Sequence, residues 1–176
     1  MSAFDRAFAV TVGQEGTLSL DPSDRGNYAS GRVGVGPVVG SMYGISAMSY
    51  PTLDIQGLTL DDAKAIYQRD YWAKAGCDKL PPPLAMLCFD AAVSSGPGRA
   101  ARWLQEAVGV KQDGSIGEIT LAAVATHQGQ GMKLLATYQA IRLRFMTSLP
   151  QWSHNRGWAD RLMVVLLAST QMEAGV

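Results

Sequence analysis

Apolar side chains near the N-terminus recur at a helical spacing. They fall every three or four positions from Phe4 to Val12, which predicts a helix over Ala3–Gln14. After this segment the pattern ends, and the chain is rich in glycine, serine, aspartate and proline as far as residue 44. The first helix therefore leads into an irregular segment rather than into a second helix.

The irregular segment contains the one convincing strand pattern of the chain. Arg32–Val35 and Val38–Ser41 flank the turn dipeptide Gly36-Pro37. Two short runs of β-branched residues around such a dipeptide are typical of a hairpin. We therefore expect one small β-hairpin, with its turn at Gly36-Pro37.

The remainder of the chain has helical patterns. Thr59 provides an N-cap hydroxyl before Asp61 and Asp62, two acids suited to a first helical turn. Leu84–Val93 is apolar almost all round, so we expect that helix to be buried. The predicted helices cover about residues 60–75, 84–93, 99–108, 120–127, 132–149 and 158–172. One helix, a small β element and about six further helices make a mainly α fold of the α+β class.

The composition narrows the possible functions. Acidic and basic residues balance at 15 each, so nucleic-acid binding is not expected. The histidines, His127 and His154, form no cluster with metal-ligand spacing, and we expect neither a metal nor an organic cofactor. The cysteines, Cys77 and Cys88, are too few for a disulfide framework, and we expect both to be free and at least partly buried.

The sequence also bears on where the protein is made. Residues 1–6 lack a basic segment followed by an apolar run, so no signal peptide is expected. Leu162–Ser169 is too short to span a bilayer, and we expect no membrane insertion. We therefore expect synthesis in the cytoplasm. If the protein acts on a cell wall, another component must carry it across the membrane.

Glu15 is the first candidate for chemistry. It lies at the end of the predicted first helix and precedes Gly16, where its side chain can point into a cleft with its base partly desolvated. Desolvation raises a carboxyl pKa, as a general acid near neutral pH requires. A solvated glutamate at a helix end is the alternative, and position by itself does not decide between the two.

Asp21 and Asp24 are the next carboxylates, in a sequence that is also ordinary turn chemistry. Hydrolysis of a glycosidic bond, however, needs two carboxyl groups that face one bond. Asp24 follows Glu15 by nine positions, and a helix end plus a short turn can place both on the walls of one cleft. The spacing therefore favours Glu15 and Asp24 as an acid–base pair.

Several motifs in order resemble glycoside hydrolase family 108, the N-acetylmuramidases found as phage endolysins and secretion-activator proteins. The resemblance covers nearly the whole chain. The matching segments are Glu15-Gly16, Asp21–Gly26, Ser41–Ser46, Leu58–Tyr67 with Asp70-Tyr71-Trp72, Phe89–Gly96, Ala100–Gln105, Val110–Thr120 and Arg156-Gly157-Trp158 with Arg161. Departures include Ser41 and Ser94, which stand where the family has threonine and asparagine, and Thr17 and Leu18, which replace a glycine and an aromatic residue.

The resemblance implies a lysozyme-like fold and hydrolysis of the β-1,4 bond between N-acetylmuramic acid and N-acetylglucosamine. It implies Glu15 as the catalytic acid. The layout of Glu15, Asp24 and Ser41 is also similar to that of tailed-phage lysozymes, which suggests water activation by Asp24 and Ser41 with inversion. The expected substrate-binding residues are Tyr43, Asp90 and Ser94.

The resemblance also implies an organisation and partners. Residues 1–95 would form the muramidase lobe with the catalytic glutamate and the hairpin, and residues 96–176 a helical, peptidoglycan-binding-like lobe packed with it. Bacterial peptidoglycan is the expected partner, with a holin-like export partner. We expect a monomer that acts in the periplasm or cell wall.

Two rival functions remain open. A lytic transglycosylase would lack a water-activating carboxylate, and Asp24 argues against it. A wall-binding or secretion-helper protein could have lost activity through the changes at Thr17. Among the other residues, Asp90 in its apolar helix suits a buried hydrogen bond as well as a cleft role, and Asp113-Gly114 suits a turn as well as a wall-binding repeat.

Overall fold

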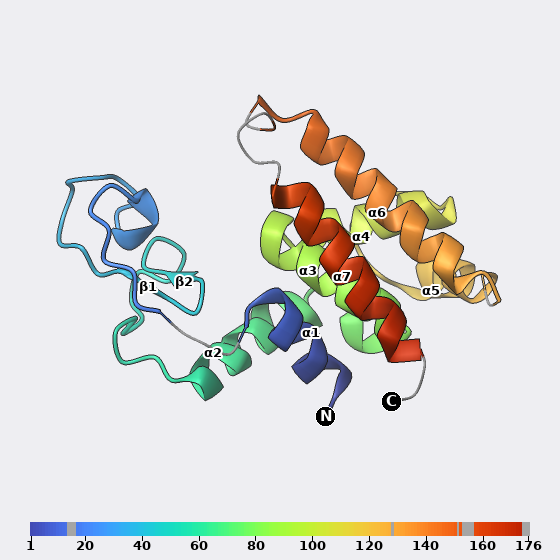
Figure 1. The fold of residues 1–176 in the computed structure, drawn as a ribbon, viewed down its shortest axis with the longest axis horizontal. Helices are drawn as coiled ribbons and strands as arrows, with labels where there is room; N and C mark the ends of the chain where they lie inside the picture. Colours follow the sequence, from blue (N-terminus) through green and yellow to red (C-terminus); the bar gives the residue numbers. More distant parts are fainter. Residues whose placement is uncertain (14–16, 128, 151, 153–156, 174–176) are drawn as a thin grey trace. The chain divides into compact units, whose positions relative to one another are not determined.

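The computed structural model describes residues 1–13, 17–127, 129–150, 152 and 157–173, and it divides into two units (Figure 1). The helical unit consists of Met1–Thr11 and Gln68–Val176, and the hairpin unit consists of Val12–Tyr67. The described residues form seven α-helices and one two-stranded antiparallel sheet. This confirms the predicted mainly α fold with one small hairpin.

The helical unit contains six of these α-helices. Its elements are α1 (Ala3–Thr11), a π-helix (Gln68–Ala73), a 3-10 helix (Cys77–Lys79), α3 (Pro82–Ser95), α4 (Pro97–Val108), α5 (Glu118–Ala125), α6 (Gly131–Thr147) and α7 (Gly157–Glu173). The five predicted helices beyond residue 80 are confirmed, with ends shifted by no more than two residues. The first helix ends earlier than predicted, at Thr11, and its predicted end at Gln14 lies outside the described residues.

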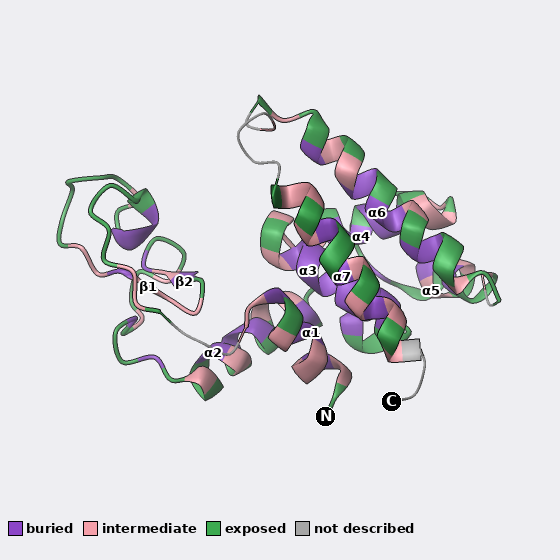
Figure 2. Cartoon of the chain, in the orientation of Figure 1, coloured by how far each residue is buried: buried purple, intermediate pink, exposed green. Residues whose placement is uncertain are grey.

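Helix α3 forms the core of the helical unit. It contacts α1, α4, α6 and α7, and Figure 2 shows it as buried along most of its length. An aromatic cluster anchors α1 to it: the ring of Phe4 lies 5.5 Å from that of Trp72 and 5.7 Å from that of Phe89, both edge-on. Edge-to-face pairs of this kind stabilise beyond their buried area. The expectation that an all-round apolar helix is buried is confirmed.

Only the first part of the helix predicted over residues 60–75 is an α-helix. Helix α2 spans Leu60–Tyr67 in the hairpin unit, and the chain then continues as the π-helix. The predicted N-cap is confirmed, because the Asp62 backbone N–H donates to the Thr59 hydroxyl oxygen at 3.2 Å and the Thr59 N–H donates to the Asp62 carboxylate at 3.1 Å. This reciprocal pair is a capping box.

The hairpin lies further along the chain than predicted. Strands β1 (Ser41–Met42) and β2 (Ile45–Ser46) pair with Ser41 opposite Ser46, and the turn is Tyr43-Gly44 rather than Gly36-Pro37. Val33 and Val35 are 54% and 51% exposed, so the β-branched side chains that suggested a strand have no core to cover. The prediction of a hairpin is confirmed, and its predicted position was wrong.

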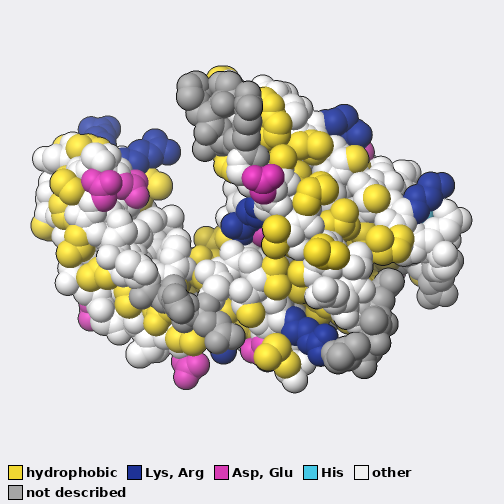
Figure 3. All heavy atoms as spheres, in the orientation of Figure 1, with side chains coloured by type: hydrophobic (Ala, Val, Ile, Leu, Met, Phe, Trp, Pro, Cys, Tyr) yellow, Lys and Arg dark blue, Asp and Glu magenta, His cyan; other side chains and the backbone are white. Residues whose placement is uncertain are grey.

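The face of the helical unit in Figure 3 carries many hydrophobic side chains over α6 and α7. On α7 the exposed ones are Met163, Val164 and Leu167. Both cysteines are free and buried, as expected. Within the described ranges, none of the helices combines the length and apolar character needed to cross a membrane.

Candidate active site

The candidate residues lie in both units. Asp24, Ser41 and Tyr43 belong to the hairpin unit, and Asp90 and Ser94 belong to α3 in the helical unit. Glu15 lies outside the described residues, so its separation from Asp24 stays a prediction.

The turn that carries the two aspartates is held by its own side chains. Asp21 Oδ1 accepts hydrogen bonds from the Ser23 backbone N–H at 2.8 Å and from the Ser23 hydroxyl at 2.7 Å. These two donors, the backbone one first, hold the pKa of Asp21 below its ordinary value. Asp21 therefore has the turn-holding arrangement that its position before Pro22 predicted.

Asp24 has a different arrangement. Its Oδ1 caps a 3-10 turn (Arg25–Asn27) by accepting from the Gly26 N–H at 2.8 Å, and the side chain is exposed. Among the described residues, none donates to its second oxygen, Oδ2. A Cβ atom on Gly26 would lie 3.2 Å from Asp24 Oδ1, so a side chain there would crowd the carboxylate. One oxygen is thus fixed, and the other can take a water molecule or a substrate group.

Asn27, which the sequence did not mark, joins this turn to the strand of Ser41. It is fully buried, and its Nδ2 donates to the Asp21 carbonyl oxygen at 3.0 Å and to the Ser19 hydroxyl at 3.3 Å. Ser19 and Ser41 pair through two backbone hydrogen bonds of 2.9 and 3.0 Å. A buried amide with this many partners fixes local geometry. Asn27 therefore links the aspartate turn to β1 through Ser19.

The same residue explains why the chain from Val38 to Gly40 does not form the predicted strand. The Asn27 carbonyl oxygen accepts from the Val39 N–H at 2.8 Å and from the Gly40 N–H at 3.1 Å. These backbone donors are therefore used by the aspartate turn and not by the Arg32–Val35 segment. An asparagine directly after the turn residues Asp21–Gly26 was the available signal, but its burial and its partners could not be read from the sequence.

Tyr43 occupies a strained position at the tip of the hairpin. Its φ of 50° lies in the left-handed region, as does the φ of 74° at Gly44, and a two-residue hairpin turn needs both. The Tyr67 hydroxyl donates to the Tyr43 carbonyl oxygen at 3.0 Å. A Cβ atom on Gly44 would lie 2.8 Å from that hydroxyl, so Gly44 is required by space as well as by conformation. Strain of this kind clusters at functional sites.

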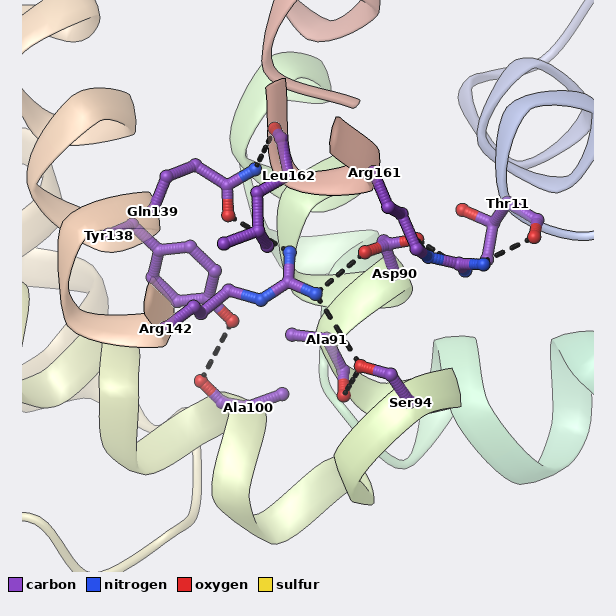
Figure 4. A network of polar contacts seen from close by, with 10 residues as sticks. All are labelled: Thr11, Asp90, Ala91, Ser94, Ala100, Tyr138, Gln139, Arg142, Arg161 and Leu162. Atoms are coloured by element: carbon purple, nitrogen blue, oxygen red, sulfur yellow. Dashed lines mark hydrogen bonds and ion pairs between the residues drawn. The ribbon is translucent and has the colours of Figure 1, made fainter. Parts of the chain in front are cut away.

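Asp90 is the centre of a buried ionic cluster that consists of Asp90, Arg142 and Arg161 (Figure 4). Arg142 Nη2 lies 2.7 Å from Asp90 Oδ2, and both side chains are fully buried. Arg161, which is 39% exposed, contacts Asp90 Oδ1 through Nε at 2.9 Å and Nη2 at 2.6 Å. The buried polar contact that the apolar helix predicted is therefore present, and Asp90 has no surface open to a ligand.

The ionic cluster also fixes neighbouring backbone. Arg161 Nη2 donates to the carbonyl oxygen of Thr11, the last residue of α1, at 3.2 Å. A cation at a helix C-terminus satisfies a free carbonyl and complements the helix dipole. Arg142 also lies 3.4 Å from the hydroxyl of Ser94, which donates to the Ala91 carbonyl oxygen. Asp90 thus holds the end of the helix that leads, four positions on, to Glu15.

The Asp113-Gly114 segment is a turn, the interpretation that the sequence favoured. Gln105, a buried residue of α4, accepts from the Gly114 N–H at 2.9 Å and donates to Asp113 Oδ1 at 2.6 Å. The Asp113 carboxylate also accepts from the Ser115 N–H at 2.9 Å. Gln105 and Ser115 hold the pKa of Asp113 below its ordinary value. Across the described part of the chain, no group of three His, Cys, Asp or Glu residues could hold a metal ion.

Comparisons with known proteins match two successive parts of the chain to two families. Residues 8–96 match the family model described as Glycosyl hydrolase 108, and residues 99–163 match one described as Predicted Peptidoglycan domain. The chain is similar to a solved structure of Brucella abortus SagA, with 28% identity, a TM-score of 0.78 and coverage of 96% of this chain and 94% of that chain. No curated protein matches the chain.

Proposed function

Since the chain belongs to glycosyl hydrolase family 108 and is a peptidoglycan hydrolase, we propose that it cleaves the β-1,4 bond between N-acetylmuramic acid and N-acetylglucosamine. In this proposal Glu15 protonates the glycosidic oxygen as the bond breaks. Asp24 takes a proton from the water molecule that attacks the anomeric carbon from the opposite face. The product carries the inverted configuration, and proton exchange with solvent restores both carboxyl groups.

The observation that carries the proposal is the state of Asp24. It is exposed, one of its oxygens is fixed by the Gly26 N–H, and the other has no donor among the described residues. A general base needs this combination of a fixed direction and a free lone pair. Asp21, by contrast, is committed to Ser23. The carboxyl groups of Glu15 and Asp24 should be separated by about 6.5–9.5 Å if a water molecule lies between the sugar and Asp24.

Two further residues of the hairpin unit have supporting roles in this proposal. Ser41 would orient the attacking water, and its strand is tied to the aspartate turn through Ser19 and Asn27. Tyr43 would stack on a sugar ring, because a strained backbone that presents an aromatic side chain is typical of a binding site. In the helical unit Ser94 is exposed and would contact substrate, whereas fully buried Asp90 would act by positioning.

The division of labour follows the two family matches. We propose that residues 1–95 supply the chemistry and that residues 96–176 hold the wall, which the match of residues 99–163 supports. The endolysin role, the holin-like export partner and the monomeric state are predictions from the resemblance.

Two variants test the proposed acid and base. Glu15→Gln removes the proton and keeps the shape, and Asp24→Asn removes the base. Each should lower the release of reducing ends from purified walls by about two to four orders of magnitude, with the fold unchanged. Asp21→Asn is the matched control, and it should cost much less. Wall cleavage at the parent rate by a folded Glu15→Gln or Asp24→Asn protein would refute the corresponding role.

The mass of the products separates hydrolysis from the lytic transglycosylase alternative. Hydrolysis adds one water to each cut, whereas a transglycosylase forms a cyclic product of lower mass. An anhydro product from the parent enzyme would overturn the proposed role of Asp24. A protein that binds walls and releases no fragments would instead be the wall-binding helper.

A further inference from the structure

A pocket of about 710 Å³ lies in the helical unit where α3 begins, α5 ends and α6 begins. It is lined by the side chains of Leu84, Val124, His127, Met132 and Lys133, among others. This volume is typical of a pocket for a small ligand. Among the described candidate residues, neither Asp24 nor Ser41 lines it, so the pocket is separate from these two residues.

The lining of the pocket is mostly apolar and carries one permanent positive charge. Leu84 and Val124 supply apolar surface, and Lys133 supplies an ammonium group. The Nδ1 atom of His127 lies 2.9 Å from the Ala123 carbonyl oxygen and 3.3 Å from the Thr126 hydroxyl, so Nε2 is the ring nitrogen left for a ligand. The lining residues that the structure describes include no aspartate or glutamate. The chemistry therefore fits a small molecule with apolar groups and a carboxylate.

We propose that this pocket binds the carboxylate-bearing peptide branch of peptidoglycan. Alanine methyl groups of that branch would lie against Leu84 and Val124, and a carboxylate would pair with Lys133. The first turn of α6, which carries Lys133, adds the positive end of a helix dipole. The proposal rests on the proposed function and adds to it the part of the wall that the C-terminal region recognises.

The glycan strand fits this pocket less well than the peptide does. Sugar rings are bound by aromatic faces and by side chains that hydrogen-bond several hydroxyl groups. Among the described residues that line the pocket there is no Phe, Trp or Tyr, and the polar side chains are those of His127, Gln130 and Lys133. A short anionic peptide needs fewer hydrogen bonds and gains from the charge.

The test is direct binding of two wall fragments to the full chain. A synthetic wall tetrapeptide, L-Ala-γ-D-Glu-diaminopimelate-D-Ala, and an N-acetylglucosamine tetrasaccharide are each titrated by calorimetry. The tetrapeptide should bind, and Lys133→Gln should weaken its binding about five- to tenfold. Lys111→Gln is the matched control, because Lys111 is also exposed but lies at the Asp113 turn. It should bind the peptide as the parent does.

A charge series at Met132 provides a second measurement, because this side chain is 52% exposed and its replacement spares the core. Met132→Glu should abolish peptide binding by repulsion, whereas Met132→Gln should change it by less than about threefold. Equal affinity of the parent, Lys133→Gln and Met132→Glu proteins for the tetrapeptide would overturn the proposal. So would a loss of binding in Lys111→Gln that matches the loss in Lys133→Gln.

Wall cleavage and tetrapeptide binding are measured separately, so the proposed function and the pocket proposal can fail independently. If the parent releases reducing ends from walls but binds no tetrapeptide, the pocket proposal fails and the hydrolase stands. If the parent binds the tetrapeptide but cleaves no wall, the proposed chemistry fails and the pocket stands.

Discussion

The ionic cluster around Asp90 makes a strong prediction about stability. Asp90→Asn removes the one carboxylate that pairs with Arg142 in the described part of the chain. The Arg142 side chain is fully buried, whereas Arg161 is 39% exposed and can turn to solvent. Breaking a buried ion pair from one side costs about 3–5 kcal/mol, because an uncompensated charge remains. At about 2–4 °C per kcal/mol for a chain of this length, the melting temperature should fall by roughly 6–20 °C.

A double-mutant cycle tests the reasoning. Arg142→Met should cost less than Asp90→Asn, because Asp90 keeps Arg161 as a partner. The double variant should lose about 1–3 kcal/mol less of its free energy of unfolding than the sum of the two single losses, because no buried charge is left unpaired. Urea unfolding followed by circular dichroism measures the free energy of unfolding of the parent, the two single variants and the double variant. Additivity within about 0.5 kcal/mol would refute the claim that the buried charges depend on each other.

The exposed ion pair between Glu106 and Arg144 supplies the control for this cycle. Its atoms are 3.1 Å apart, and its side chains are 40% and 67% exposed. Surface pairs contribute about 0–1 kcal/mol, so Glu106→Gln should leave the free energy of unfolding nearly unchanged. A cost for Glu106→Gln as large as that of Asp90→Asn would show that burial is not the cause.

Three further predictions concern the hairpin unit and the cysteines. Tyr43→Gly should raise the free energy of unfolding by up to about 1 kcal/mol, because it removes left-handed strain. It should also slow wall cleavage, because it removes the proposed contact with a sugar ring. A variant that is less stable and fully active would contradict both the strain and the sugar contact. Burial raises the pKa of the Cys88 thiol to about 12 and raises that of Cys77 further, so neither should react with a thiol reagent near pH 8 until the protein is unfolded. Because the pKa of Asp21 is depressed in the folded protein, this carboxylate contributes stability at pH values above the ordinary aspartate pKa. This contribution is lost as the pH falls through the folded pKa. Ser23→Ala should raise the pKa of Asp21, measured as its titration midpoint by NMR.

What the sequence could predict depended on how local the cause was. Burial of α3 was predictable because residues 84–93 are apolar on every face, and the N-cap of α2 because Thr59 and Asp62 lie three positions apart. The hairpin was misplaced because valine-rich segments have β propensity wherever they lie. Its actual position depends on Asn27 and Ser19, whose backbone partners among residues 39–41 lie 12 to 22 positions further along the sequence.

The candidate site shows the same limit. The turn role of Asp21 follows from a serine two positions later. The partners of Asp90, by contrast, are 52 and 71 positions away, and no periodicity in the sequence joins them. The sequence could predict a buried hydrogen bond for Asp90, but it did not identify Arg142 and Arg161 as the partners. Which side chains reach Asp90 depends on how α6 and α7 pack on α3.

The contacts of Asp90 join residues that belong to both family matches. The matches meet between residues 96 and 99, but the Asp90 cluster crosses that point, since Asp90 comes before it and Arg142 and Arg161 come after it. The Arg161 contact with the Thr11 carbonyl joins positions 150 apart in sequence. A segment that ended at residue 95 would keep Asp90 and lose both of its cations together with the helices that pack over it. The part of the chain that matches the Predicted Peptidoglycan domain therefore also supplies Arg161, which holds α1, the helix that leads to Glu15, against α3.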